Sequence, residues 1–356
     1  MAEGVVRIGI VGAGAITRQR HIPGFRALPG VRIVGVCNRR RESSNRVARE
    51  FDIPRIFDSW EHLVDSEDID AVVIGTWPYL HCPVTLAALD AGKHVLTQAR
   101  MAMNAREAQR MLDKSREHPE LVAMVVPSPY GLTGDRFVRK LIADGALGRQ
   151  LRELHVTSWS GDLADRRTPL HWRQVTKYSG FNMLNLGILH ETALRWTAPP
   201  VRVYALANKF IPRRDDPETG QRVRVGTPDS VQVISTQEDG SVGVYRISGV
   251  LWHDHGNSIA LYGSAGTLVY DLTGDRIRYG RAGEPELKTL AIPDELRGGW
   301  QVEADFVAAI REGRPVTHTD FLTGARYMHF TEAVARSSRH QEPVDLPLKE
   351  FSNPSL

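Results

Sequence analysis

The chain has 356 residues, which is enough for two domains with large cores. Its 42% hydrophobic and 24% charged residues are typical of a globular protein, and a formal net charge of +3 with scattered arginines is too small to indicate a nucleic-acid partner. Two cysteines, Cys37 and Cys82, exclude a disulfide framework, and no apolar run reaches the roughly 18 to 20 residues of a membrane helix.

The N-terminal residues show no basic segment followed by an apolar core, so the pattern of a signal peptide is missing. We therefore expect a cytoplasmic protein with no membrane partner. His253 and His255 flank Asp254, but this trio is more typical of a loop than of a metal site, and we expect no metal.

The stretch RIGIVGAGAIT at 7–17 reads as a short strand, a glycine turn and the start of a helix. Gly12 and Gly14 fill the first two places of the G-x-G-x-x-G dinucleotide fingerprint, and the larger Thr17 holds the third. The first glycine permits a tight turn, and the second lets a pyrophosphate approach the helix N-terminus. Two glycines after a strand also occur in ordinary strand–helix turns, so the fingerprint needs support from the segments that follow.

A second buried strand at 31–37 ends at Asn38, where NAD enzymes carry an acid for the ribose 2′-hydroxyl. Asn38 is neutral, and Arg39, Arg40 and Arg41 follow it. Guanidinium groups bind a 2′-phosphate that a carboxylate would repel, so the sequence favours NADP(H) over NAD(H). The alternative is that these arginines only begin a solvated helix.

Strands and helices alternate through the rest of the first half. Helices are predicted at 42–51, 83–91 and 104–117, and strands at 71–76, 94–96 and 121–126. This order predicts a Rossmann-type, doubly wound parallel sheet in an α/β chain. Because ligands bind at the carboxyl ends of such strands, the glycine turn, Asn38, the 76–78 segment and the 98–100 segment should surround one crevice.

The second half has strands without crossover helices between them. They are predicted at 151–160, 202–210, 230–237, 241–250, 258–263 and 266–271, with helices at 183–196, 300–312 and 320–337 and a loop at 212–228. This pattern predicts an α+β domain with an antiparallel sheet, solvated on one face. We expect a dinucleotide-binding domain at 1–126 and a substrate-binding domain at 127–356, whose last helices can pack back on the first domain.

Several segments together carry a family pattern. They are GIVGAGAI at 9–16, TWPYLH at 76–81, AGKHVLTQARMAMN at 91–104, IADGALGR at 142–149, WR at 172–173, NLGILHETALRW at 185–196, ALYGSAGTLVYD at 260–271 and a closing stretch at 306–346. In this order the chain resembles the Gfo/Idh/MocA family, the glucose–fructose oxidoreductase and inositol dehydrogenase group. The motifs are loose one by one but specific in combination.

The resemblance implies an NAD- or NADP-dependent oxidoreductase that acts on sugars, polyols or related carbonyl compounds. It also implies a C-terminal domain with a large open antiparallel sheet, through which many members oligomerise, so we expect a homodimer or homotetramer. The candidate cofactor-binding residues are Gly12, Gly14, Ala15, Ile16, Asn38, Arg39, Arg40, Thr76, Trp77, His81, Gln98 and Arg100. Arg100 is also suited to hold an anionic substrate group, and His81 is more typical of a structural residue.

The chain departs from the family's catalytic pattern at three places. The family motif E-K-P is Gln98-Ala99-Arg100 here, so Ala99 replaces the lysine. In the family motif D-x-G-x-H, Asn185 replaces the aspartate and Leu189 the histidine, with His190 one place further on. An offset of one residue rotates a helical side chain by about 100°, so His190 is not a simple substitute.

The residues that remain for catalysis come from the same motif region. The candidate catalytic residues are His190, Lys177, Tyr178 and Asn185, and the candidate substrate-binding residues are Trp172, Arg173 and Glu191, with Glu191 also considered as a base. Lys177 and Tyr178 also fit a solvated loop, and Arg173 also fits a structural partner of an acid.

Three functions follow from these observations. The first is a NADP(H)-dependent dehydrogenase or reductase for a sugar-like substrate, with a relocated base. The second is a lyase, isomerase or glycosidase that retains its cofactor and uses the hydride transiently. The third is a non-catalytic, nucleotide-binding regulatory protein.

Overall fold

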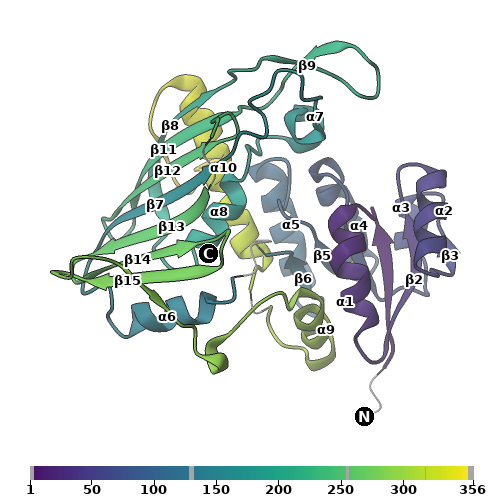
Figure 1. Ribbon diagram of the computed structural model, residues 1–356. Helices are drawn as coiled ribbons and strands as arrows, with labels where there is room; N and C mark the ends of the chain where they lie inside the picture. Colours follow the sequence, from purple (N-terminus) through teal and green to yellow (C-terminus); the bar gives the residue numbers. More distant parts are fainter. Residues whose placement is uncertain (1–3, 128–131, 254–255, 317, 352–356) are drawn as a thin grey trace. The chain divides into compact units, whose positions relative to one another are not determined.

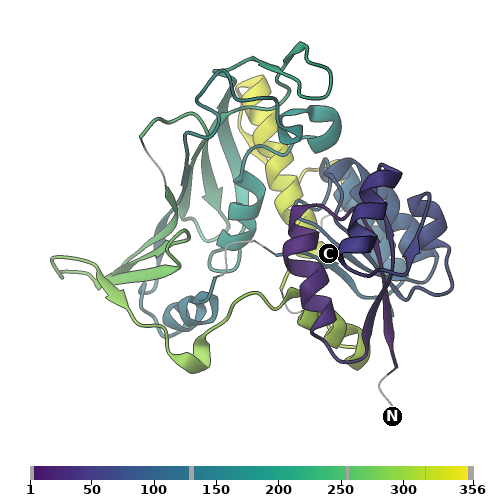
Figure 2. The same cartoon turned by 45° about the vertical axis from the view of Figure 1, so that its right-hand side comes forward.

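The computed structural model describes residues 4–127, 132–253, 256–316 and 318–351 (Figures 1 and 2). These residues form two compact units. Unit 1 contains residues 4–127 and, from far along the chain, 301–325; unit 2 contains residues 132–300 and 326–351. The chain therefore returns to unit 1 at residue 301 and goes back to unit 2 at residue 326.

Unit 1 is built on a six-stranded parallel sheet with the order β3-β2-β1-β4-β5-β6. The strands are β1 (Val6–Val11), β2 (Val31–Cys37), β3 (Arg55–Ile56), β4 (Ala71–Ile74), β5 (His94–Thr97) and β6 (Ala123–Val125). All four residues of β4 are buried, as expected for a central strand covered by helices on both faces. The predicted Rossmann-type sheet is confirmed.

Helices connect these strands in the expected alternation. They are η1 (Thr17–His21), α1 (Ile22–Arg26), α2 (Arg41–Glu50), α3 (Trp60–Val64), η2 (Pro78–Leu80), α4 (His81–Asp90), α5 (Ala105–Glu117) and, from the later part of the chain, α9 (Val302–Glu312). The start of α5 agrees with the helix predicted from residue 104. The Asn104 side chain accepts a hydrogen bond from the backbone amide of Glu107 at 2.9 Å and caps the helix. In η1 the helix has a π-type turn, a feature often found at functional sites.

Residues 301–325 complete unit 1. The Val125 amide of β6 donates to the Thr319 carbonyl at 2.8 Å, and Met124 forms an isolated bridge with Asp320. The Arg311 side chain of α9 donates to the Pro29 carbonyl at 2.6 Å. This late segment therefore covers the edge of β6 and packs beside α1.

Unit 2 is built on a nine-stranded sheet with the order β16-β15-β14-β13-β7-β12-β11-β8-β17. Its strands are β7 (Leu151–Trp159), β8 (Pro200–Asn208), β11 (Ser230–Gln237), β12 (Val242–Ser248), β13 (Gly256–Gly263), β14 (Gly266–Asp271), β15 (Arg276–Arg281), β16 (Lys288–Leu290) and β17 (Val344–Asp345). A short hairpin, β9 (Arg213–Asp215) with β10 (Arg222–Arg224), lies in the region expected to be a loop.

The expectation of a purely antiparallel sheet is wrong for one pair, because β7 runs parallel to β12. On its other side, β7 is antiparallel to β13. Since β7 lies between two strands of opposite direction, it must run parallel to one of them. All other pairs in this sheet are antiparallel, so the predicted α+β unit with a large open sheet is otherwise confirmed.

The remaining helices belong to unit 2, except that α10 begins within unit 1. They are α6 (Asp135–Ala143), η3 (Trp172–Gln174), α7 (Thr176–Ser179), α8 (Leu186–Ala193), η4 (Asp294–Leu296) and α10 (Phe321–His340). Figures 1 and 2 show α8 and α10 on the same face of the large sheet. The other face is open, and β11 alternates between buried and exposed residues as that arrangement requires.

Candidate active site

The glycine turn at the end of β1 leaves no room for side chains on its inner side. Gly12 has a φ of +86°, and a Cβ there would lie 2.7 Å from the Thr76 amide nitrogen. Across the turn, a Cβ on Gly75 would lie 2.2 Å from both the Gly12 carbonyl oxygen and the Thr17 hydroxyl. Gly75 thus makes the space for Thr17 at the third place of the fingerprint, and the Thr17 hydroxyl donates to the Gly12 carbonyl at 3.2 Å.

The side chain of Asn38 holds this turn against the end of β2. Its Oδ1 atom accepts a hydrogen bond from the Ala13 amide at 2.7 Å, and its Nδ2 atom donates to the Ser43 hydroxyl at 3.2 Å. The Ser44 hydroxyl accepts from the Asn38 amide at 2.9 Å. Asn38 lies at the predicted position, but its oxygen is already used to shape the turn.

A cavity of about 590 Å³ opens along the turn and the end of β2. Gly12, Gly14, Asn38, Thr76 and Trp77 are among its lining residues. Beside it, Gly14, Ala15 and Ile16 are exposed at the start of the helix, where the first amide groups precede the helical hydrogen-bond ladder. A cradle without side chains at a helix N-terminus fits the pyrophosphate of a dinucleotide.

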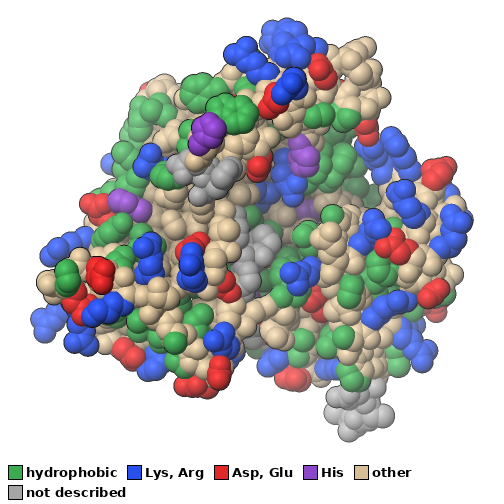
Figure 3. Space-filling model, in the orientation of Figure 1, with side chains coloured by type: hydrophobic (Ala, Val, Ile, Leu, Met, Phe, Trp, Pro, Cys, Tyr) green, Lys and Arg blue, Asp and Glu red, His purple; other side chains and the backbone are tan. Residues whose placement is uncertain are grey.

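Positive charge is concentrated on the β2 side of this cavity. Arg39, Arg40 and Arg46 line it, and Arg39 lies over the Trp77 ring with its guanidinium carbon 5.2 Å from the ring centroid. Asp58 also lines the cavity but forms an ion pair with Arg41. Figure 3 shows Lys and Arg side chains over the α2–β3 part of unit 1. The cavity therefore has the charge expected of an anion-binding pocket.

His81 and Arg100 are placed differently from the sequence expectation, because both side chains are buried. His81 is fully buried; its Nδ1 lies 2.9 Å from the Arg100 carbonyl oxygen and its Nε2 lies 3.0 Å from that of Thr76. Burial lowers its pKa. His81 therefore links the loops after β4 and β5 and has no surface with which to contact a cofactor. Arg100, which follows a cis Ala99–Arg100 peptide bond, is only 6% exposed.

Gln98 follows β5 and is half-buried. Its Nε2 atom lies 2.5 Å from Nε2 of His21, and Nδ1 of His21 lies 2.5 Å from a carboxylate oxygen of Glu303. His21 and Glu303 were not found by sequence reasoning, because His21 lies four residues beyond the fingerprint and Glu303 more than 200 residues after Gln98. The only sequence signal for a contact between Glu303 and His21 was the prediction that the last helices can pack on the first domain.

The environment of His190 does not fit its expected role as the general base. His190 is 2% exposed, its Nδ1 lies 2.8 Å from the Tyr245 hydroxyl, and its ring stacks on Phe330 with centroids 3.6 Å apart. Burial lowers its pKa to about 3. This is the environment of a histidine in a hydrophobic core, and a base must reach its substrate.

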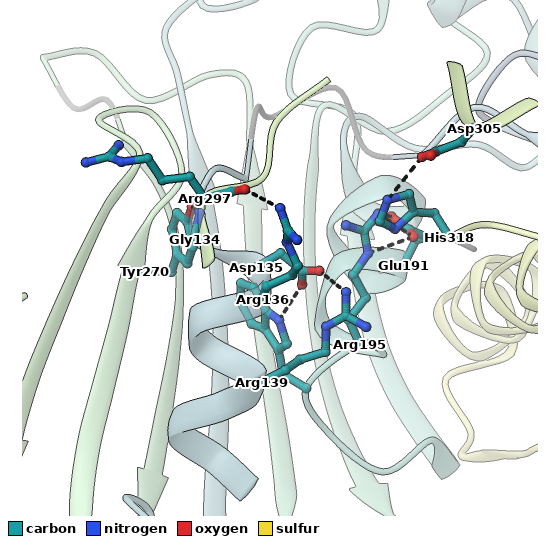
Figure 4. A network of polar contacts seen from close by, with 11 residues as sticks. Gly134, Asp135, Arg136, Arg139, Glu191, Arg195, Tyr270, Arg297, Asp305 and His318 are labelled. Carbon is teal, nitrogen blue, oxygen red and sulfur yellow. Dashed lines mark hydrogen bonds and ion pairs between the residues drawn. The ribbon is translucent and has the colours of Figure 1, made fainter. Parts of the chain in front are cut away.

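Glu191 is also held in the interior of unit 2 (Figure 4). Arg195, one turn further along, donates to both of its carboxylate oxygens, at 2.7 Å and 3.0 Å from Nη2. Nearby, Asp135 accepts a hydrogen bond from the Trp196 indole at 2.8 Å and forms an ion pair with Arg139. The bidentate pair fixes Glu191 in a structural role, so the expectation that it binds substrate or acts as the base is not supported.

The other five candidates of unit 2, Trp172, Arg173, Lys177, Tyr178 and Asn185, lie at or near the surface. Arg173 lies over the Trp172 ring at 4.4 Å, and Lys177 lies over the Tyr178 ring at 4.7 Å. Asn185 precedes α8 and is half-exposed. These side chains keep accessible polar groups, which His190 and Glu191 do not.

The segment 163–170, which precedes these residues in the chain, is anchored by Arg214 of β9, which sequence reasoning missed. Arg214 is fully buried and donates hydrogen bonds to the carbonyls of Asp165 at 2.9 Å, Thr168 at 2.8 Å, and Leu163. The Leu170 amide in turn donates to the Asp215 carbonyl at 2.9 Å. Arg214 is one of two adjacent arginines in a polar stretch between Pro212 and Pro217, and nothing in the sequence distinguishes it from Arg213.

Within the described ranges, no cluster of three or more His, Cys, Asp or Glu side chains could hold a metal ion. Asp254 and His255 of the trio considered above lie outside the described residues. In the part of the chain that the structure describes, every helix is too short or too polar to cross a membrane.

Comparison with known proteins agrees with this geometry. Residues 6–126 match an oxidoreductase family described as having an NAD-binding Rossmann fold, and residues 136–269 match the GFO/IDH/MocA C-terminal domain. The chain belongs to the Gfo/Idh/MocA family. It is therefore an oxidoreductase with a nucleotide-binding first domain, as the sequence motifs predicted.

Similarity over nearly the full length includes a relative with a named activity. Levoglucosan dehydrogenase of Pseudarthrobacter phenanthrenivorans is 25% identical and aligns with 96% of this chain and 98% of its own length. A solved structure of levoglucosan dehydrogenase, in complex with NADH and L-sorbose, has a TM-score of 0.86 at 22% identity and covers 96% of this chain and 99% of its own. The 1,5-anhydro-D-fructose reductase of Ensifer adhaerens is 34% identical over 41% of this chain and 43% of its own length.

Proposed function

We propose that this Gfo/Idh/MocA protein is an oxidoreductase for a sugar-like, polyol or related carbonyl substrate, with a preference for NADP(H). The observation that carries the cofactor proposal is the cavity beside the glycine turn, where Arg39, Arg40 and Arg46 line the side that would receive the adenosine ribose. No acid stands at the end of β2, and Asp58 is paired with Arg41. A 2′-phosphate would add two negative charges to a site with this excess of arginine.

The test is calorimetric titration of the purified protein with NADPH and NADH. We expect NADPH to bind more tightly, and Arg40→Ala to weaken NADPH binding roughly tenfold while leaving NADH binding nearly unchanged. Arg49→Ala, which replaces an exposed arginine of α2, the helix that begins directly after Arg40, is the matched control. Tighter binding of NADH by the unaltered protein would contradict the proposal.

The sugar-like substrate is supported by the full-length similarity to levoglucosan dehydrogenase. A nicotinamide cofactor held by unit 1 would supply the hydride chemistry, and this chain's own residues must move the hydroxyl proton. Ala99 and Leu189 cannot do so, and Asn185 is no base at neutral pH. We assign proton transfer to Lys177 or Tyr178, and substrate binding to Trp172, Arg173 and Asn185, because these side chains remain accessible.

Replacement of the two candidates separates them. Tyr178→Phe or Lys177→Met should lower kcat by at least about 100-fold if the removed group transfers the proton, with little change in the binding of NADPH. His190→Gln is the reference variant. A loss of that size in His190→Gln but in neither of the other two would return the role of base to His190.

The absence of the family lysine and histidine favours a second candidate, in which the cofactor is retained and the hydride returns to the product. A lyase, isomerase or oxidoreductive glycosidase of this kind would be purified with bound cofactor. It would form product without a net change in absorbance at 340 nm. Net NADPH consumption with a sugar or polyol would exclude it.

We also propose that the enzyme is a homo-oligomer, a dimer or tetramer, which forms through the open face of the unit 2 sheet. Apolar side chains are exposed on two neighbouring strands of this sheet, namely Tyr204 and Leu206 on β8 and Ile234 on β11. Register places Tyr204 directly opposite Ile234. Contiguous exposed apolar residues on a sheet face are typical of a protein–protein interface. The two buried, unpaired cysteines support a reducing compartment such as the cytoplasm.

A further inference from the structure

Three side chains from distant parts of the chain form a buried hydrogen-bonded series in unit 1. Glu303 is the second residue of α9, His21 ends the π-type turn η1, and Gln98 follows β5. The two contacts, Glu303 to His21 and His21 to Gln98, are both 2.5 Å. The fold makes room for the series at Gly24, where a Cβ would lie only 2.7 Å from the carboxyl carbon of Glu303.

The chemistry of the groups sets the direction of each hydrogen bond. An ionised carboxylate only accepts, so Glu303 requires the proton of a neutral His21 to be on Nδ1. The lone pair of His21 Nε2 then accepts from the amide group of Gln98, whose Nε2 atom faces it. Because the NH₂ group of Gln98 donates to His21, the side-chain oxygen of this half-buried residue remains as a hydrogen-bond acceptor.

The order of strands indicates what Gln98 faces. A dinucleotide crosses a doubly wound sheet at the carboxyl ends of its strands. Here the arginine-lined cavity lies toward β2, the glycine turn follows β1, and Gln98 lies two strands further on, after β5. In a cofactor with its adenosine ribose in the cavity and its pyrophosphate at the turn, the nicotinamide would therefore lie toward β4 and β5.

We propose that the Gln98 oxygen accepts a hydrogen bond from the carboxamide NH₂ of the nicotinamide, and that His21 and Glu303 are positioning residues that fix the Gln98 amide in this orientation. This inference rests on the proposed dinucleotide binding but not on the identity of the substrate. It explains why an uncharged glutamine can stand where the family pattern has a glutamate: His21 and Glu303 determine which end of the amide points outward.

The test compares three probes by calorimetry, namely NADP⁺, its 3-acetylpyridine analogue and 2′-phospho-ADP-ribose. The analogue replaces the carboxamide NH₂ by a methyl group, and the third probe lacks the nicotinamide. We expect the unaltered protein to bind NADP⁺ roughly tenfold more tightly than the analogue. In Gln98→Leu this ratio should fall to about one, while the affinity for 2′-phospho-ADP-ribose is unchanged.

Glu303→Gln tests the positioning role, because an amide can donate to His21 as well as accept from it. His21 can then carry its proton on Nε2 and reverse the Gln98 amide, so the ratio should fall about threefold or more. Glu312→Gln, an exposed residue on the same helix α9, is the control and should keep the full ratio. A purely structural ion pair would change stability without changing the ratio.

The possible outcomes distinguish the role of Gln98 from the proposed binding of the dinucleotide. An unchanged ratio in Gln98→Leu, with tight binding of NADP⁺, overturns the inference and leaves the proposed cofactor intact. An unchanged ratio in Glu303→Gln removes the positioning role. If the unaltered protein binds none of the three probes, the proposed cofactor itself fails.

Discussion

Gly75 and Gly14 lie near the same turn, but the structure gives them different roles. A Cβ on Gly75 would lie 2.2 Å from the Gly12 carbonyl oxygen and from the Thr17 hydroxyl, whereas a Cβ on Gly14 would approach only the Gly75 carbonyl, at 3.5 Å. Gly75→Ala should therefore lower the free energy of unfolding by about 1–3 kcal/mol, since backbone cannot yield as a flexible side chain does.

Gly14→Ala is the matched variant. It should leave the free energy of unfolding within about 0.5 kcal/mol of the unaltered protein but weaken NADPH binding, because the added methyl group stands in the cradle. Urea unfolding and calorimetry measure the two effects. Equal stability of both variants would show that the contact between β4 and the turn is less tight than the geometry indicates.

The depressed pKa of His190 predicts a pH-dependent stability. The folded protein keeps His190 neutral down to about pH 3, whereas the unfolded chain takes up a proton at this residue near the ordinary histidine pKa, about 6.5. Above that pH the residue is neutral in both states, so it does not contribute to the pH dependence of the free energy of unfolding. Below it, the free energy of unfolding falls with falling pH, by up to about 1.4 kcal/mol per pH unit from this residue.

His190→Gln removes this contribution and keeps a group that can hydrogen bond with Tyr245. Urea unfolding at pH 7.5 and pH 5 should therefore show a smaller loss of stability on acidification in the variant than in the unaltered protein. Identical losses in the two proteins would mean that His190 titrates alike in the folded and unfolded states, which would place it outside the core.

At the level of single residues, the sequence predicted the position of the glycine turn after β1 and of Asn38 at the end of β2, because both positions follow from local chain geometry. It could not predict the fate of His190. The helical spacing of Leu186, Leu189 and Ala193 correctly identified a core face, and a residue off that face is normally accessible. Every residue of α8 is buried, however, so the position of a side chain around this helix does not decide its exposure.

Among the elements, the β9–β10 hairpin supports the segment 163–170 through Arg214. Arg214→Met would leave the carbonyls of Leu163, Asp165 and Thr168 without this donor. We expect a loss of about 2 kcal/mol or more in the free energy of unfolding and faster amide exchange in residues 163–170.

Arg213→Met is the control for that variant, since Arg213 is the exposed neighbour on the same strand. It should change neither the free energy of unfolding nor the exchange rates beyond experimental error. If the two variants behave alike, the arginine clamp does not stabilise the segment.

The elements that the sequence predicted well are those with continuous or alternating apolar patterns. For β2, the predicted and observed ranges are both 31–37. The strand β15 was missed because its sequence, RIRYGR, places arginines on the open face and few apolar residues on the other. The parallel pairing of β7 with β12 could not be predicted, because it depends on where a strand inserts among others and leaves no local signal.

At the scale of the assembly, the open sheet face predicts association of identical chains. Ile234 is 58% exposed and lies directly opposite the exposed Tyr204 of β8. Ile234→Arg should convert the oligomer to a monomer, because burying an unpaired guanidinium in an apolar interface costs several kcal/mol. Light scattering after size-exclusion chromatography measures the mass. Thr219→Arg, in the exposed β9–β10 turn, should leave the mass unchanged, and a monomeric unaltered protein would refute the proposed interface.

The late return of residues 301–325 to unit 1 has a consequence for synthesis on the ribosome. Until that segment has left the exit tunnel, β6 lacks the partner that Thr319 supplies, and the face of α1 that later meets α9 stays open to water. A nascent chain stalled near residue 130 would thus display an unfinished sheet edge, which invites chaperone capture. Unit 1 can complete its fold only after residues 132–300 of unit 2 have been synthesised.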